Sequence, residues 1–152
     1  MNKIAIILIV TFALLSCGKT VKCSDTPVEI AFISFPLHSI DTLVIKKFVQ
    51  NSNFQNLIDT INLINANTVV VADTVYINRI NSINILQRGF DWQIVVPASN
   101  RTFSISNIVY QEEIRNCGTF ESCICFNKII SVKVNGQILT INPTPANFVF
   151  LR

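Results

Sequence analysis

The stretch KIISVKVNGQILTIN, residues 128–142, decides the fold class of this 152-residue chain. Apolar and polar residues alternate on both sides of Asn135-Gly136, which is the pattern of two half-buried β-strands. Both residues of an Asn-Gly pair tolerate the positive φ that a two-residue hairpin turn requires. The stretch therefore predicts an antiparallel hairpin that turns at Asn135 and Gly136.

The segment before this hairpin predicts a second pair of strands. FDWQIVV (90–96) alternates, PASN (97–100) supplies turn residues, and RTFSISNIVY (101–110) alternates again. The first strand would place four large side chains on one face: Phe90, Trp92, Ile94 and Val96. The second strand would direct three side chains toward the core: Phe103, Ile105 and Val109. Trp92 could alternatively be an exposed platform for a sugar, but its apolar neighbours on the same face favour a place in the core.

The rest of the chain has the same character. Further strands are predicted over residues 28–35, 42–50, 60–65, 68–73 and 147–151. Residues 51–59 are predicted to form a loop, and residues 74–89 fit no single period. About eight to ten short strands without intervening helices are typical of an antiparallel β-sandwich, immunoglobulin-like or transthyretin-like. An up-and-down β-barrel is the alternative.

The N-terminus carries a secretory signal. Residues 1–3 (MNK) are basic and residues 4–15 (IAIILIVTFALL) are all apolar except Thr11. Twelve helical residues span roughly 18 Å, well short of the ~30 Å hydrocarbon core of a bilayer. A basic start followed by a short apolar run is typical of a signal peptide.

The apolar run ends in Leu14-Leu15-Ser16-Cys17, followed by Gly18. This end resembles the lipobox of bacterial lipoproteins. The chain as a whole resembles small lipoproteins of Bacteroidota in its general character. The resemblance implies cleavage before Cys17 and a diacylglyceryl group on its sulfur. Residues 1–16 would then be the signal peptide, 17–27 a lipid-anchored tether and 28–152 a single β domain. Gly18 carries no inner-membrane retention signal, so the outer membrane is the expected location. An ordinary signal peptide cut elsewhere is the alternative.

Four further thiols remain if Cys17 is lipidated: Cys23, Cys117, Cys123 and Cys125. An even number in an exported chain indicates two disulfides. Cys123 and Cys125 are too close in sequence to bond without strain. We favour Cys117–Cys123 with Cys23–Cys125 over the remaining connectivity. A zinc site is disfavoured because the paired C-x2–4-C spacing is missing.

The remaining polar residues predict no catalytic centre, metal site or cofactor. His38, the single histidine, is expected to be solvated in a turn. Glu112 and Glu113 would point to opposite faces of a strand. The five aspartates are too dispersed for a calcium loop. Without residues 1–16 the chain has 12 − 1 = 11 basic and 9 acidic residues, which gives no electrostatic reason to bind nucleic acid.

Three Asp-Thr-aliphatic triplets occur at residues 41–43, 59–61 and 73–75. They resemble the O-glycosylation sequon of exported Bacteroidota proteins, which implies glycans on Thr42, Thr60 and Thr74. The alternative is that each Asp-Thr pair closes a turn before a strand.

These features predict a non-enzymatic, membrane-anchored lipoprotein of the cell envelope that binds an envelope protein or a glycan. The alternative is a carrier of a small apolar ligand in a β-barrel cavity. An apolar cavity above about 300 Å³ would favour the carrier, whereas a filled interior would favour the binding module. An enzyme would need His38 or Glu112 and Glu113 to meet a partner in a cleft.

Overall fold

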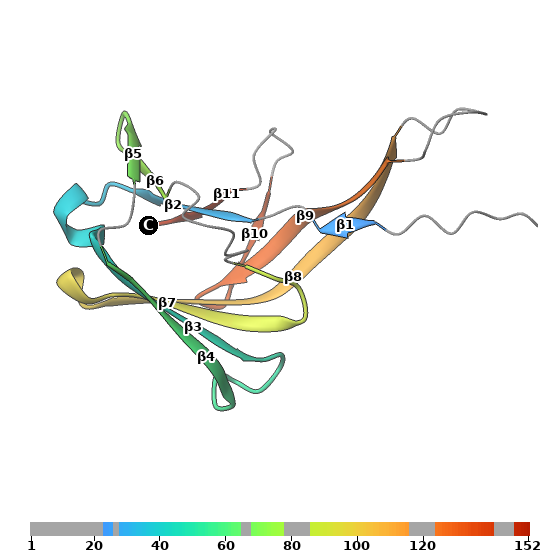
Figure 1. The fold of residues 1–152 in the computed structure, drawn as a ribbon, viewed down its shortest axis with the longest axis horizontal. Helices are drawn as coiled ribbons and strands as arrows, with labels where there is room; N and C mark the ends of the chain where they lie inside the picture. The colour runs from blue at the N-terminus through green and yellow to red at the C-terminus, as the bar shows by residue number, and fades with distance from the viewer. Residues whose placement is uncertain (1–22, 26–27, 65–67, 78–85, 116–123, 142–147) are drawn as a thin grey trace, which may run out of the picture.

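The computed structural model describes residues 23–25, 28–64, 68–77, 86–115, 124–141 and 148–152, which fold into two packed β-sheets (Figure 1). The larger sheet has seven strands: β1 (Ser24–Asp25), β3 (Thr42–Val49), β4 (Leu57–Ile64), β7 (Phe90–Val96), β8 (Arg101–Arg115), β9 (Ile124–Val134) and β10 (Gln137–Thr140). The smaller has four: β2 (Glu29–Ile33), β5 (Thr68–Val71), β6 (Thr74–Ile77) and β11 (Phe148–Leu151). The predicted all-β sandwich is confirmed. Among the described strands neither sheet closes on itself, so the barrel alternative is wrong.

The two sheets bury one apolar core between them. The smaller sheet contributes Ile30 and Phe32, and the larger sheet contributes Ile94 and Phe103, all at most 3% exposed. The ring of Phe32 packs edge-on against Phe103, with centroids 6.1 Å apart. Burial of each large apolar side chain contributes about 1.5–3 kcal/mol. Because both sheets share this cluster, each depends on the other for its stability.

The hairpin predicted at Asn135 and Gly136 is present. β9 pairs with β10 in antiparallel register, with Val134 opposite Gln137. Asn135 and Gly136 form the turn with φ of 48° and 85°. The Asn135 side chain also accepts a hydrogen bond from the Ser104 backbone N–H at 2.8 Å, which ties the turn to β8.

A β-bulge in β8 shifts residues away from the faces that simple alternation predicts. A register shift between Ser106 and Val109, where Asn107 has a φ of 49°, leaves Val109 exposed and lets Ile108 pack against the core. The inward placement of Val109 was therefore wrong. A second bulge lies in β4: Ile58 is skipped between Asp59, which lies opposite Lys47, and Leu57, which lies opposite Phe48, while the pairing of β3 with β7 stays regular. A bulge inserts one residue and so inverts the alternation beyond it.

Most strand pairs are antiparallel, but two are parallel. β11 runs parallel to β2, and β1 runs parallel to β9. β1 lies within residues 17–27, the segment predicted to be a tether, so part of that segment belongs to the larger sheet. Among the described residues, no helix is long and apolar enough to cross a bilayer.

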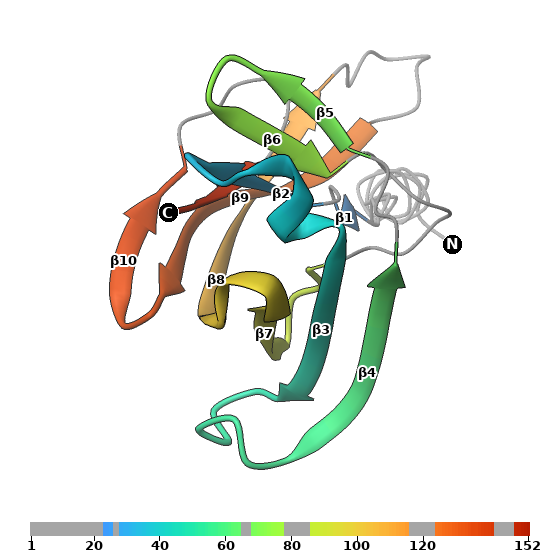
Figure 2. The ribbon, with the colours of Figure 1, turned by 90° about the vertical axis from the view of Figure 1, so that its left-hand side faces the viewer.

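The sheet edges determine where the molecule is open. β9 pairs with β8 along one side, while β1 and β10 follow one another along its other side. β4 forms the opposite edge of the larger sheet. In the smaller sheet, β11 and β5 are the two edge strands (Figure 2). On the side of the sandwich formed by β10 and β11, no described strand joins the two sheets.

Candidate functional site

An apolar groove lies on this open side, between β10 and β11. Its volume is about 610 Å³. Phe103, Val132 and Val134 line it from β8 and β9, and Leu139 and Phe150 line it from the two edge strands. The volume exceeds the 300 Å³ expected of a ligand site, but the space is a groove at the margin of a filled core rather than the interior of a barrel.

The alternation of β10 directs its side chains to two different surroundings. Leu139 is half-buried and lines the groove, whereas Ile138 before it is 70% exposed on the other side of the strand. In β11, Val149 and Leu151 are buried in the core, and Phe150 is 42% exposed at the groove. Each edge strand also presents backbone N–H and C=O groups along its outer side.

The lining of the groove suits apolar contact more than chemistry. Arg152 is the single charged residue among the described lining residues, and the polar ones are Asn135, Gln137 and Thr140. None of the described lining residues is an acid, a histidine or a cysteine. The groove can therefore bury apolar side chains and pair with a backbone, and its described lining contributes no carboxylate, imidazole or thiol.

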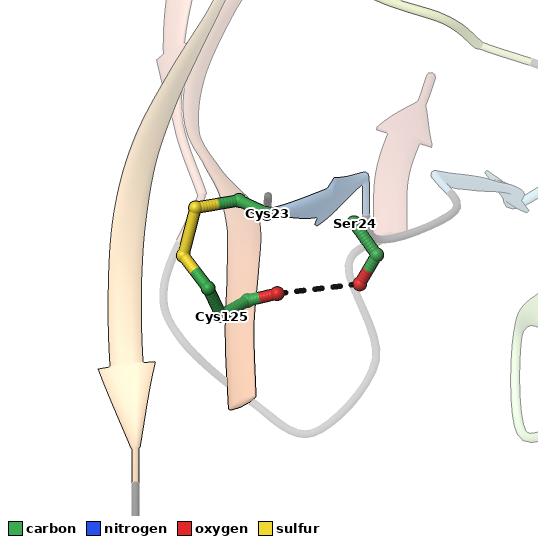
Figure 3. Close-up of a disulfide and its surroundings, with 3 residues drawn as sticks. All are labelled: Cys23, Ser24 and Cys125. Atoms are coloured by element: carbon green, nitrogen blue, oxygen red, sulfur yellow. Dashed lines mark hydrogen bonds between the residues drawn. A yellow bond between two sulfur atoms is a disulfide. The ribbon is translucent and has the colours of Figure 1, made fainter. Parts of the chain in front are cut away.

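The disulfide that ties down the N-terminal segment lies on the outer edge of β9 (Figure 3). Cys23 is bonded to Cys125, with Cα atoms 4.4 Å apart. The Ser24 hydroxyl donates a hydrogen bond to the Cys125 carbonyl at 3.3 Å. The predicted Cys23–Cys125 pair is confirmed. Cys17, Cys117 and Cys123 lie outside the described residues, as does the signal segment.

The polar residues considered for catalysis are not brought together. His38 is exposed in η1 (Leu37–Ile40). Glu112 and Glu113 lie within β8, in the part that pairs with β9 near Cys125, and Figure 1 shows this part at the opposite end of the molecule from η1. Glu113 forms an ion pair with Lys128 at 3.9 Å. The prediction that the strand ends before these glutamates was wrong, because β8 continues to Arg115.

Trp92 is 2% exposed, so its predicted place in the core is confirmed. Its indole N–H donates to the Gln87 carbonyl at 3.2 Å, which satisfies the polar end of the ring. Beside it, the Lys47 ammonium lies 3.7 Å from the centroid of the Phe90 ring. This contact covers an edge of the core with the stem of a charged side chain.

The three predicted glycosylation sites differ in exposure. Thr42 and Thr60 are exposed on β3 and β4. They point to one face of the larger sheet, because Thr60 lies opposite Lys46, four residues after Thr42 on the same strand. Thr74 is only 8% exposed, and its hydroxyl donates to the Asp73 carboxylate at 3.2 Å. The fold leaves room for a glycan at Thr42 and Thr60, and not at Thr74.

One buried carboxylate, Asp91, does not form a metal site. It is 3% exposed and accepts a hydrogen bond from the Asn51 backbone N–H at 2.8 Å. The part of the chain that the structure describes contains no group of three or more histidines, cysteines or acids that could hold a metal ion. Asp91 instead anchors the turn between β3 and β4.

Comparison with known proteins adds no relative: no family model, no curated protein and no solved structure matches this chain. The groove is thus the feature that carries the functional argument. Sequence reasoning missed it because its walls come from strands that are far apart in sequence. The one available signal was the apolar run at residues 147–151, which the alternation of exposed Phe150 and buried Leu151 now explains.

Proposed function

We propose that this protein is a membrane-anchored lipoprotein of the cell envelope that acts as a non-enzymatic binding module. The open apolar groove between β10 and β11 carries the proposal of binding. The lipobox-like residues Leu14 to Cys17 support the anchor, with the outer membrane as its location. Cys23 lies six residues after Cys17, so its bond to Cys125 would hold the domain close to the bilayer.

The chemistry of the groove favours a protein segment over a glycan as its partner. A glycan presents many hydroxyl groups, and eight of the twelve described lining side chains are apolar and cannot pair with them. An apolar side chain gives up no hydrogen bonds to water when it enters such a surface. Its burial contributes about 25 cal/mol per Å² of apolar surface. The partner is therefore expected to be another envelope protein.

A photo-cross-linking residue placed in the full chain tests this proposal on intact cells. Position 150 lines the groove, while position 138 is exposed on the other side of β10 and provides the matched control. We expect a discrete cross-linked protein from position 150 and none from position 138. Equal products from both positions, or no product from position 150, would contradict the proposal.

The anchor has its own test. In Cys17→Ser the thiol that would accept the lipid is missing, so the protein should keep its signal segment or leave the membrane fraction. A Cys17→Ser protein that is processed normally and remains membrane-bound would rule out lipidation at this residue.

A carrier of a small apolar ligand is the second candidate, supported by the groove volume of about 610 Å³. Ligand sites commonly have volumes of about 300–1,000 Å³ and a mainly apolar lining. Native mass spectrometry of the full chain distinguishes the two functions. A carrier would retain a small ligand of constant mass that Phe150→Asp loses, whereas the binding module would retain no such ligand.

A further inference from the structure

The two edges of the smaller sheet have complementary chemistry. β5 forms one edge and β11 forms the other, with β6 and β2 between them. Figure 1 shows the β5–β6 hairpin at the margin of the molecule. β5 is an exposed apolar strand, and β11 is a wall of the apolar groove.

The described residues of β5 include no charge, proline or bulge of the kind that usually protects an edge strand. Its sequence is Thr-Val-Val-Val, and Val69, Val70 and Val71 are 47%, 51% and 57% exposed. Edge strands are normally blunted by lysine, proline or a bulge. β5 contains no charge and no proline, and its pairing with β6 is regular from Thr68 to Val71. Such a strand can form backbone hydrogen bonds with a strand of another molecule.

β11 offers a matching acceptor. It also has four residues, Phe148 to Leu151, and pairs with β2 along one edge. Its other edge borders the groove. Among the described residues that line the groove, Arg152 is the single charged one. A charged strand would lose solvation there without a partner, so the groove favours an uncharged one.

We propose that β5 of a second copy of this chain adds to the edge of β11 that pairs with no described strand, and fills the groove. This inference rests on the proposed function of the groove as a binding site. Successive side chains of the added strand would point to opposite faces. One face would pack on Phe103, Val132 and Leu139, and the other would lie beside Phe148 and Phe150. Valine on both faces of β5 suits both surroundings.

The contact joins different surfaces of the two copies. The receiving copy keeps its own β5 free, and the donating copy keeps its own groove free. A heterologous contact of this kind extends into a filament unless its rotation closes a ring. The smaller sheet would thus continue from one molecule to the next.

Two charge substitutions separate the donor from the acceptor. Val70→Asp spoils β5 and leaves the groove intact, while Phe150→Asp spoils the groove and leaves β5 intact. Both side chains are exposed in the single molecule, so the new carboxylates remain solvated and the fold should persist. Ile64→Asp is the matched control, because Ile64 is 70% exposed at the end of β4 in the other sheet.

The measurement is sedimentation of the full chain purified in detergent, over a range of concentrations. We expect the unchanged protein and Ile64→Asp to form species larger than a dimer, and each of the other two variants to be monomeric. An equimolar mixture of Val70→Asp and Phe150→Asp should give a one-to-one dimer, because one intact groove then meets one intact β5. Circular dichroism and the retained Cys23–Cys125 disulfide check the fold of each variant.

Three results would overturn the inference: an unchanged protein that is monomeric throughout, a mixture that stays monomeric, or a Phe150→Asp protein that still dimerises. The last would indicate symmetric pairing of β5 with β5. Cross-linking from position 150 separates this failure from that of the binding function. If it captures a different protein, the groove binds a partner other than a second copy; if it captures nothing, both proposals fail.

Discussion

Cys23 is bonded to Cys125, 102 residues later in the chain. The bond holds β1 in parallel register against β9, with Ser24 opposite Phe126. Two hydrogen-bonded residues would be a poor anchor on their own, since pairing of so short a strand barely offsets the entropy of ordering it. The disulfide therefore holds β1 on the larger sheet, which its two paired residues alone would not do.

Replacement of both cysteines in Cys23→Ala/Cys125→Ala should lower the free energy of unfolding by about 2–4 kcal/mol, because a long loop in the unfolded chain is no longer closed. Denaturant unfolding followed by fluorescence measures the change. Ser24→Ala is the control, since it removes only the hydrogen bond to the Cys125 carbonyl, and its midpoint should move little. A double variant as stable as the unchanged protein would show that the bond has no structural role.

The strands that sequence could predict are those in which burial alternates without interruption. β7 was predicted with its bounds, because Trp92, Ile94 and Val96 enter the core at every second residue. The bulges at Ile58 and Asn107 could not be predicted in this way, since the pairing with the neighbouring strand places them and the local pattern does not. β1 was missed because a Ser-Asp strand has no apolar alternation at all.

The groove was beyond sequence reasoning for a different reason. Alternation indicates which face of a strand is buried, but it does not say which strand lies at an edge. Leu139 and Phe150 belong to strands of different sheets, and only the packing of those sheets places them around one space. The disulfide was predictable because counting thiols restricts the pairs before any geometry is known.

The Asn135-Gly136 turn gives the second stability prediction. Gly136 has a φ of 85° and open space around its Cα, so a substitution there is opposed by backbone conformation alone. Gly136→Ala should cost about 1 kcal/mol, and Gly136→Asn should cost less because asparagine tolerates a positive φ. Thermal unfolding of the two variants ranks them. If alanine were the better tolerated of the two, the turn would have to adopt another conformation.

Asp91 gives the third prediction. Its carboxylate accepts the Asn51 N–H in a buried position. Asp91→Ala leaves that donor without its partner and should lower the free energy of unfolding by about 1–3 kcal/mol. Asp91→Asn keeps an acceptor oxygen and should cost less. Urea unfolding checks both, with the exposed Asp41→Ala as a control expected to stay within about 0.5 kcal/mol. Equal losses in the alanine and asparagine variants would contradict this role.

The last prediction concerns glycosylation. Thr42 and Thr60 are exposed on one face of the β3–β4 pair, whereas Thr74 is buried with its hydroxyl bonded to Asp73. We expect intact mass spectrometry of the protein from its native cells to show a mass above that of the polypeptide with the proposed lipid. Thr42→Ala and Thr60→Ala should each remove one glycan mass, and Thr74→Ala should remove none, because a sugar on a buried hydroxyl would force β6 away from its neighbours. A mass equal to that of the polypeptide with the proposed lipid alone would end the hypothesis, and a loss at Thr74 would mean that modification precedes folding.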